Sequence, residues 1–223
     1  MKKFKFFSII ALVLFSFLSC SDDDDGPNLV PIEADQVTNL FAPITNPPGP
    51  PGPPAPDEGD FTKFDFATGA VTTSDTEWDI AFRSTAIIVN GGVSSGANDE
   101  PDRNGNAAAY FIDEPFQDVN EVNTSSFVQD SQASYAIIRQ SDMGWYNYSG
   151  FNNNPPIPTV DNIIRPLAGR TLVFRTRDGK FAKVQILSYY QNNPNPINSF
   201  TDVPRYYTFN YVYQPNDGVT TFE

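Results

Sequence analysis

The sequence of 223 residues contains no histidine, a single cysteine and only two methionines. The absence of histidine excludes Ser-His-Asp and Cys-His catalytic arrangements and histidine-based zinc sites. A pair of carboxylates, as in glycosidases, remains available for catalysis. Asp79, Glu114 and Asp161 are candidates, but nothing in the sequence brings any two of them together. We therefore expect that the protein is not an enzyme.

Basic residues are also scarce, because 14 Lys and Arg stand against 27 Asp and Glu and give a net charge of −13. Three of the lysines, Lys2, Lys3 and Lys5, lie in an N-terminal leader, so its removal takes the net charge from −13 to −16. A chain this acidic favours neither nucleic acid nor an anionic membrane surface as a partner.

The first 19 residues have the pattern of a bacterial signal peptide. The three lysines precede an apolar run, residues 6–17, that is too short to span a bilayer comfortably. Cys20 ends the sequence LSC, which is typical of a lipobox, so we predict that residues 1–19 are removed and that Cys20 is lipidated. Simple cleavage nearby is the alternative. A lipidated Cys20 leaves no thiol for a disulfide, a nucleophile or a metal site.

Residues 20–60 have the composition of a tether. The four aspartates at 22–25 resemble the surface-export signal of Bacteroidetes-type lipoproteins, which is compatible with a solvated spacer. The stretch 43–60 is rich in proline and favours a polyproline II spacer. Residues 29–42 are mildly apolar and either add a strand or stay loose. We expect the folded domain to span residues 61–223, held at the cell surface by a lipid anchor in the outer membrane.

The composition of this domain favours an all-β fold with antiparallel sheets and long loops. Apolar residues make up 39% of the chain, 19 Phe and 10 Tyr are enough for one core, and no long stretch has helical periodicity. Residues 170–190 predict a hairpin on a two-residue type I′ turn at Asp178-Gly179, with Val173 facing Val184. A third strand follows at residues 206–214, where an aromatic residue occupies every second position. These three strands should form the centre of the sheet.

The first half of the domain predicts shorter strands and an exposed loop. Residues 61–66 and 70–73 predict a second hairpin. Residues 77–83 predict a strand with Trp78, Ile80 and Phe82 on one face, and residues 87–89 predict a buried strand. Residues 94–106 predict a mobile loop near the mouth of a pocket. The loops at residues 152–158 and 192–196, rich in Asn and Pro, are candidates for the rim of a site.

Several ordered motifs resemble the HmuY-like haem-binding surface lipoproteins. They are WDIAFR at 78–83, NGG at 90–92, GWYNY at 144–148, RTRDGKFAK at 175–183 and YYTFNY at 206–211. The resemblance covers residues 60–214 and implies an all-β fold with a haem pocket between protruding loops. It also implies an outer-membrane lipoprotein that takes up haem or a related porphyrin and passes it to a TonB-dependent receptor. Members of the family bind the iron through histidines or methionines, whereas this chain has no histidine.

Met143 is therefore the possible thioether ligand of haem iron, and Tyr146 and Tyr148 are possible phenolate ligands. Each has a structural alternative, because methionine fills gaps beside aromatic rings and tyrosines pack in strands. Arginines could pair with the haem propionates or with the many acidic residues of the chain. The candidates are Arg139, Arg165, Arg175 and Arg177.

Two other functions remain open at this point. The chain could be a relative that keeps the fold but binds a different ligand, or that acts as a docking protein, without haem. It could also be a carbohydrate-binding module or carbohydrate-active enzyme at the cell surface, which is the least favoured of the three.

Overall fold

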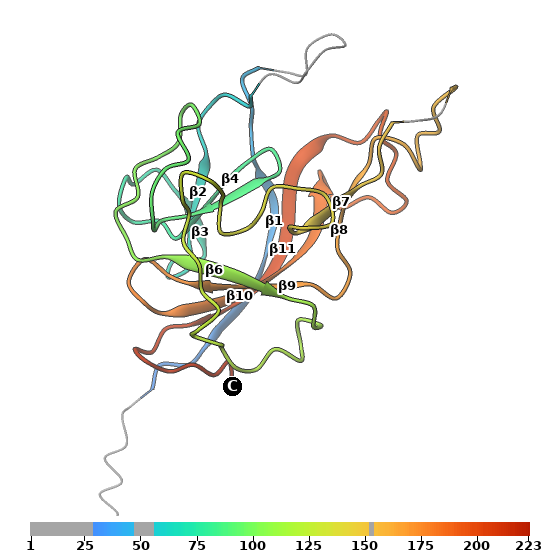
Figure 1. Ribbon diagram of the computed structural model, residues 1–223. Helices are drawn as coiled ribbons and strands as arrows, with labels where there is room; N and C mark the ends of the chain where they lie inside the picture. Colours follow the sequence, from blue (N-terminus) through green and yellow to red (C-terminus); the bar gives the residue numbers. More distant parts are fainter. Residues whose placement is uncertain (1–28, 47–55, 152–153) are drawn as a thin grey trace, which may run out of the picture.

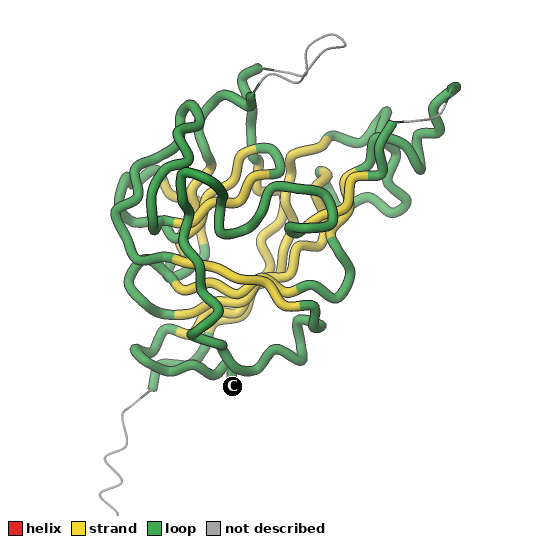
Figure 2. The backbone as a smooth tube through the Cα atoms, viewed as in Figure 1, coloured by secondary structure: helices red, strands yellow, loops and turns green. Residues whose placement is uncertain are grey.

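The computed structural model describes residues 29–46, 56–151 and 154–223. The predicted signal peptide, the predicted lipidation site Cys20, the acidic run and residues 47–55 of the proline-rich stretch lie outside these residues. The described chain forms strands and loops and contains no helix (Figure 2). No helix that could cross a membrane is therefore present in this part of the protein. The predicted all-β fold with antiparallel sheets is confirmed.

The larger sheet has five antiparallel strands in the order β1-β11-β10-β9-β6 (Figure 1). Its strands are β1 (Glu33–Phe41), β6 (Ala108–Ile112), β9 (Thr171–Arg175), β10 (Phe181–Tyr190) and β11 (Pro204–Gln214). The three predicted central strands are β9, β10 and β11, as expected. The aromatic alternation in β11 is also confirmed, because Tyr207, Phe209, Tyr211 and Tyr213 all join the main core.

The predicted register of the β9–β10 hairpin is wrong by one residue. Arg175 pairs with Phe181 and Leu172 pairs with Val184, so Val173 does not face Val184. The loop closes with the amide of Thr176 donating to the carbonyl of Lys180 at 2.8 Å, and Gly179 has a φ of +93°. This is a three-residue loop with a glycine bulge rather than the two-residue type I′ turn. The one-residue shift exchanges the faces, so Leu172, Ala182 and Val184 point into the main core.

The smaller sheet has four antiparallel strands in the order β3-β2-β4-β5. They are β2 (Thr62–Asp65), β3 (Ala70–Thr72), β4 (Ile80–Arg83) and β5 (Ala86–Val89). The predicted hairpin and buried strand are confirmed. Trp78 differs from the prediction, because it precedes β4 and packs with Ala81 and Ile88 on the outer face, whereas Ile80 and Phe82 lie in the core between the sheets.

Aromatic rings from both sheets fill that core. Phe64 of the smaller sheet lies 5.5 Å from Phe209 of the larger one, and Phe82 lies 4.8 Å from Tyr207, measured between ring centroids. All four side chains are fully buried. Burial of each such side chain stabilises the fold by about 1.5–3 kcal/mol, so these contacts hold the two sheets together.

The β9–β10 loop adds a polar link between the sheets. Arg177 donates to Asp65 of β2 at 2.7 Å, to Glu77 at 2.7 Å and to Asp79 at 3.3 Å, and its amide donates to Asp79 at 2.9 Å. Asp65 and Asp79 are buried, so both carboxylates depend on this guanidinium for charge compensation. The loop of one sheet is thereby fixed against the other.

The predicted boundary between tether and domain at residue 61 needs a correction. β1 lies within residues 20–60, and its residues pair with β11 from Glu33↔Tyr213 to Phe41↔Tyr206. Leu40 is 4% exposed and belongs to the main core. Because this strand completes the larger sheet, the folded domain includes residues 33–41, which the mildly apolar composition of 29–42 left undecided.

Candidate ligand-binding site

A short third sheet, β7 (Tyr146–Tyr148) with β8 (Ile164–Pro166), is anchored to the core by the aromatic residue before it. Trp145 is 2% exposed, and its indole Nε1 donates to the carbonyl of Thr85 at 2.9 Å. Its ring contacts those of Tyr146, Tyr189 and Tyr207. This anchor fixes the base of the hairpin, whereas the chain beyond Tyr148 projects from the body of the domain (Figure 1).

Two loops that are distant in sequence project together at this end, and we call them the arm. The arm comprises the described residues 148–151 and 154–163, between β7 and β8, and residues 191–203, between β10 and β11. The amide and the hydroxyl of Ser199 both donate to the carbonyl of Pro158, at 2.9 and 3.1 Å. The two loops predicted from the sequence to form the rim of a site are thus held against each other.

Each loop of the arm is closed by one aspartate. Asp161 Oδ2 accepts a hydrogen bond from the amide of Ile157 at 2.7 Å, and Asp202 Oδ2 accepts one from the amide of Asn198 at 2.7 Å. Both bonds bridge four residues of the chain and satisfy backbone donors that a turn otherwise leaves exposed. The two carboxylates therefore shape the loops.

Apolar side chains are concentrated on the surface of the arm. Of the thirteen exposed large hydrophobic side chains among the described residues, six lie here. They are Tyr148, Phe151, Ile157, Val160, Phe200 and Val203. Residues 148–160 and 191–201 contain no charged residue, although 18% of the chain is charged. A clustered, uncharged, apolar surface of this kind is typical of a binding site.

A cavity of about 420 Å³ opens at the base of the arm. It is lined by Arg165, Pro166, Leu187, Ser188 and residues 193–197. Arg165 is the one charged residue in this lining, and its Nη2 donates to the carbonyl of Thr159 at 3.1 Å. It forms no ion pair with any described residue. The cavity thus combines proline, leucine and isoleucine side chains and the polar groups of Ser188, Asn193 and Asn195 with a guanidinium group that can bind an anionic group.

The structure places the three predicted ligand residues in different environments. Met143 is 48% exposed on the turn before β7, where its amide donates to the carbonyl of Gln140 at 3.3 Å. Tyr146 is 8% exposed and packs against Trp145. Tyr148 is 41% exposed, and its hydroxyl donates to Asn162 Oδ1 at 3.1 Å. Tyr148 alone belongs to the arm, and none of the three lines the cavity at its base.

The four predicted arginines divide into those with acidic partners and those without. Arg139 pairs with Asp57, and Arg177 pairs with the carboxylates that link the two sheets. Arg175 instead donates to the carbonyl of Asn106 at 2.8 Å. Arg165 therefore remains the best placed of the four for a ligand carboxylate.

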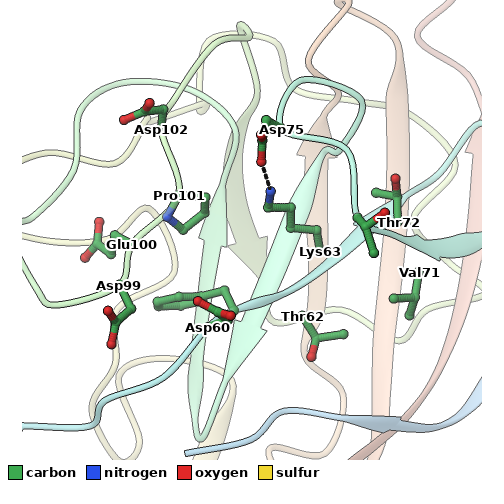
Figure 3. A pocket seen from close by; sticks show the side chains of 12 residues that line it. Asp60, Thr62, Lys63, Val71, Thr72, Asp75, Asp99, Glu100, Pro101 and Asp102 are labelled. Atoms are coloured by element: carbon green, nitrogen blue, oxygen red, sulfur yellow. Dashed lines mark hydrogen bonds and ion pairs between the residues drawn. The ribbon is translucent and has the colours of Figure 1, made fainter.

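A larger cavity, of about 670 Å³, lies between β2, β3 and residues 99–102 (Figure 3). Its acidic lining residues are Asp60, Asp75, Asp99, Glu100 and Asp102. Lys63 is the only basic residue in the lining, and its Nζ is already bonded to Asp75 at 2.8 Å. Because like charges repel, this cavity is unsuited to a ligand that carries carboxylates.

The loop at residues 94–106, which we expect to be mobile, is fixed by a buried ion-pair network. Arg103 donates to Glu100 and to Asp130, both at 3.0 Å, and all three side chains are at most 2% exposed. Residues 99–102 line the larger cavity, whereas no residue of this loop lines the cavity at the base of the arm. Within the described ranges, no group of three His, Cys, Asp or Glu side chains is arranged to hold a metal ion.

Fold and site together define an all-β domain of two packed sheets with an arm that exposes apolar side chains beside a cavity lined by an arginine. The family model described as HmuY protein matches residues 57–211. The chain therefore belongs to the HmuY family, and the resemblance noted in the sequence is confirmed.

Three solved structures are similar to this chain at low sequence identity. A Bacteroides vulgatus structure, described as a HmuY-like haem-binding protein, is 16% identical over 83% of this chain and 93% of its own, with a TM-score of 0.44. A Bacteroides fragilis lipoprotein is 16% identical over 70% and 83%, with a TM-score of 0.40. The apo HmuY analogue of Tannerella forsythia is 12% identical over 85% and 100%, with a TM-score of 0.46. No curated protein matches the sequence.

The sequence did not reveal which loops assemble or where the cationic cavity lies. The one available signal was the lack of charge in residues 148–160 and 191–201, which separates these loops from the rest of an acidic chain.

Proposed function

We propose that this protein binds haem or a related porphyrin on its arm, at the surface of the cell. The observation that carries the proposal is the arm itself, which exposes Phe151 and Phe200 and adjoins a cavity lined by Arg165. A porphyrin is a flat apolar ring with carboxylates at one edge. Aromatic and proline side chains can pack on its faces, and a guanidinium can bind a carboxylate through two hydrogen bonds.

The lipid anchor and the proline-rich stretch would serve delivery of the bound ligand. In this proposal Cys20 carries the lipid, the proline-rich stretch holds the domain away from the outer membrane, and a TonB-dependent receptor takes the ligand. The arm projects from the body of the domain, so a receptor can reach a ligand there without opening the core (Figure 1). The family to which the chain belongs supports the proposal.

A titration tests this proposal. Haem is added to the mature chain with Cys20→Ser, and the Soret band and the quenching of tryptophan fluorescence are followed. The chain has two tryptophans, and Trp145 is anchored at the base of the arm. The proposal requires saturable one-to-one binding at micromolar haem or below. A response that never saturates, and that bovine serum albumin as a competitor removes entirely, would contradict it.

The acidic cavity of about 670 Å³ favours a second candidate function, in which the chain keeps the fold but binds a different ligand or a docking partner. The exposed carboxylates Asp60, Asp99 and Asp102 suit a cationic ligand or a basic surface on a partner protein. A binding screen with lysine-rich and glutamate-rich peptides of equal length distinguishes this candidate. Salt-sensitive binding of the lysine-rich peptide, combined with no binding of haem, would favour it over the first proposal.

A further inference from the structure

We infer that the arm recognises the tetrapyrrole ring rather than its metal, so that metal-free porphyrin binds as tightly as haem. This inference rests on the proposed function and specifies the ligand class of the same site. It follows from a mismatch between the donors that iron needs and the groups that the arm and its cavity offer.

The side chains that usually ligate haem iron are absent from this site. The sequence contains no histidine, and its one cysteine is Cys20, in the predicted lipidation motif. Met143, the one methionine beyond the leader, lies on the turn before β7 and is not part of the cavity lining. Imidazole and thiolate ligation are therefore not available to a ring held by the arm, and no thioether lines the cavity.

The phenols at this site are engaged in hydrogen bonds. The hydroxyl of Tyr148 donates to Asn162 Oδ1 at 3.1 Å, and the hydroxyl oxygen of Tyr190 accepts a bond from the amide of Ile164 at 3.1 Å. Burial raises the pKa of Tyr190, which disfavours the phenolate that iron requires. The carboxylates of Asp161 and Asp202 accept bonds from loop amides, as described above.

The site does, in contrast, offer apolar side chains that can pack on the porphyrin ring and a cation that can bind its carboxylates. Leu187, Pro194 and Ile197 supply apolar cavity walls, and Arg165 supplies the cation. Phe151 and Phe200, on the two loops of the arm, are 58% and 59% exposed. These groups contact parts of the ligand that haem and metal-free protoporphyrin share, so removal of the iron removes no contact.

The test compares haem, metal-free protoporphyrin IX and zinc protoporphyrin in titrations of the mature chain with Cys20→Ser, followed by quenching of tryptophan fluorescence. The inference predicts dissociation constants that agree within about threefold. It also predicts that Arg165→Ala and Phe151→Ala each lower the affinity for all three ligands by a similar factor of about five or more. Val93 is exposed outside the arm, so Val93→Ala should leave the three affinities unchanged.

Two outcomes would overturn the inference, and they can be told apart. Haem that binds more than about tenfold tighter than metal-free protoporphyrin, with a six-coordinate low-spin spectrum, would show that the protein ligates iron and would leave the proposed function intact. Failure of all three tetrapyrroles to bind would overturn both the inference and the proposed function.

Discussion

The amide of Ser199 donates to the carbonyl of Pro158 at 2.9 Å, and this bond joins two loops that lie 41 positions apart in the sequence. The hydroxyl of Ser199 donates to the same carbonyl. The arm is thus a single structure made from two otherwise separate loops, and the account of ligand binding depends on their staying together.

We predict that Ser199→Pro separates the two loops, because proline has no amide proton to donate. The affinity for porphyrin should fall about fivefold or more. Ser199→Ala is the matched control, since it keeps the amide and removes only the hydroxyl, and it should change the affinity by less than about twofold. Fluorescence titration measures both. Equal affinity of the proline variant and the wild type would show that the link does not matter for binding.

The interface between the two sheets should depend strongly on Arg177. Arg177→Ala leaves the buried carboxylates of Asp65 and Asp79 without their cation, which we expect to lower the free energy of unfolding by about 3 kcal/mol or more. Arg175→Ala, in the same hairpin, removes two hydrogen bonds to uncharged oxygens of Asn106 and leaves no buried charge unpaired, so it should cost only about 1–2 kcal/mol. Urea denaturation gives both values, and a smaller loss for Arg177 than for Arg175 would contradict this interpretation.

Asp79 should make the stability depend on pH. Burial raises its pKa from the ordinary value of 3.8 to about 6, although hydrogen bonds from the amides of Arg177 and Phe66 and the charge of Arg177 oppose the shift. The folded state therefore holds the proton more tightly than the unfolded chain does. The stability that this group contributes is fully present below about pH 4 and is lost as the pH rises through about 6.

Denaturant titrations at several values between about pH 4 and pH 7 test this effect in the wild type and in Asp79→Asn. Relative to the variant, the wild type should lose stability over this range, by up to about 3 kcal/mol for a shift of roughly two pKa units. Parallel curves for the two proteins would show that Asp79 keeps an ordinary pKa in the folded state.

Met143→Ala tests whether Met143 ligates haem iron, as the sequence suggested, or whether the ligand is bound by the arm without it. Met143 is exposed on a turn outside the cavity, so its removal should leave the affinity for haem within about twofold and the haem spectrum unchanged. Loss of a thioether-type spectrum in the variant would restore Met143 as an iron ligand. Met143→Leu, which keeps the size of the side chain, serves as the control.

The sequence predicted much of the sheet, because alternation along a strand is a local property. Every second residue of β11 from Tyr207 is aromatic, and that pattern requires one buried face. The pairing of β9 with β10 was wrong because it depends on the geometry of the turn. Asp178-Gly179 is compatible with two loop lengths, and the choice between them shifts the register by one residue.

The candidate site was less predictable for a different reason. The Asn- and Pro-rich loops were recognised as loops, but the bond from Ser199 to Pro158 is a contact between distant segments that no local pattern specifies. The availability of Arg165 could not be read from the sequence either. It depends on which arginines find acidic partners after folding, as Arg139 and Arg177 do.

The central claim is that the arm binds the porphyrin ring, and one comparison tests it most directly. Metal-free protoporphyrin IX is titrated into the mature chain and into the same chain with Phe151→Ala and Phe200→Ala together. The account predicts saturable one-to-one binding by the first protein and an affinity at least about tenfold lower for the second, because the two exposed phenylalanine rings of the arm are lost. Binding that is unaffected by the double substitution, or absent from both proteins, would contradict it.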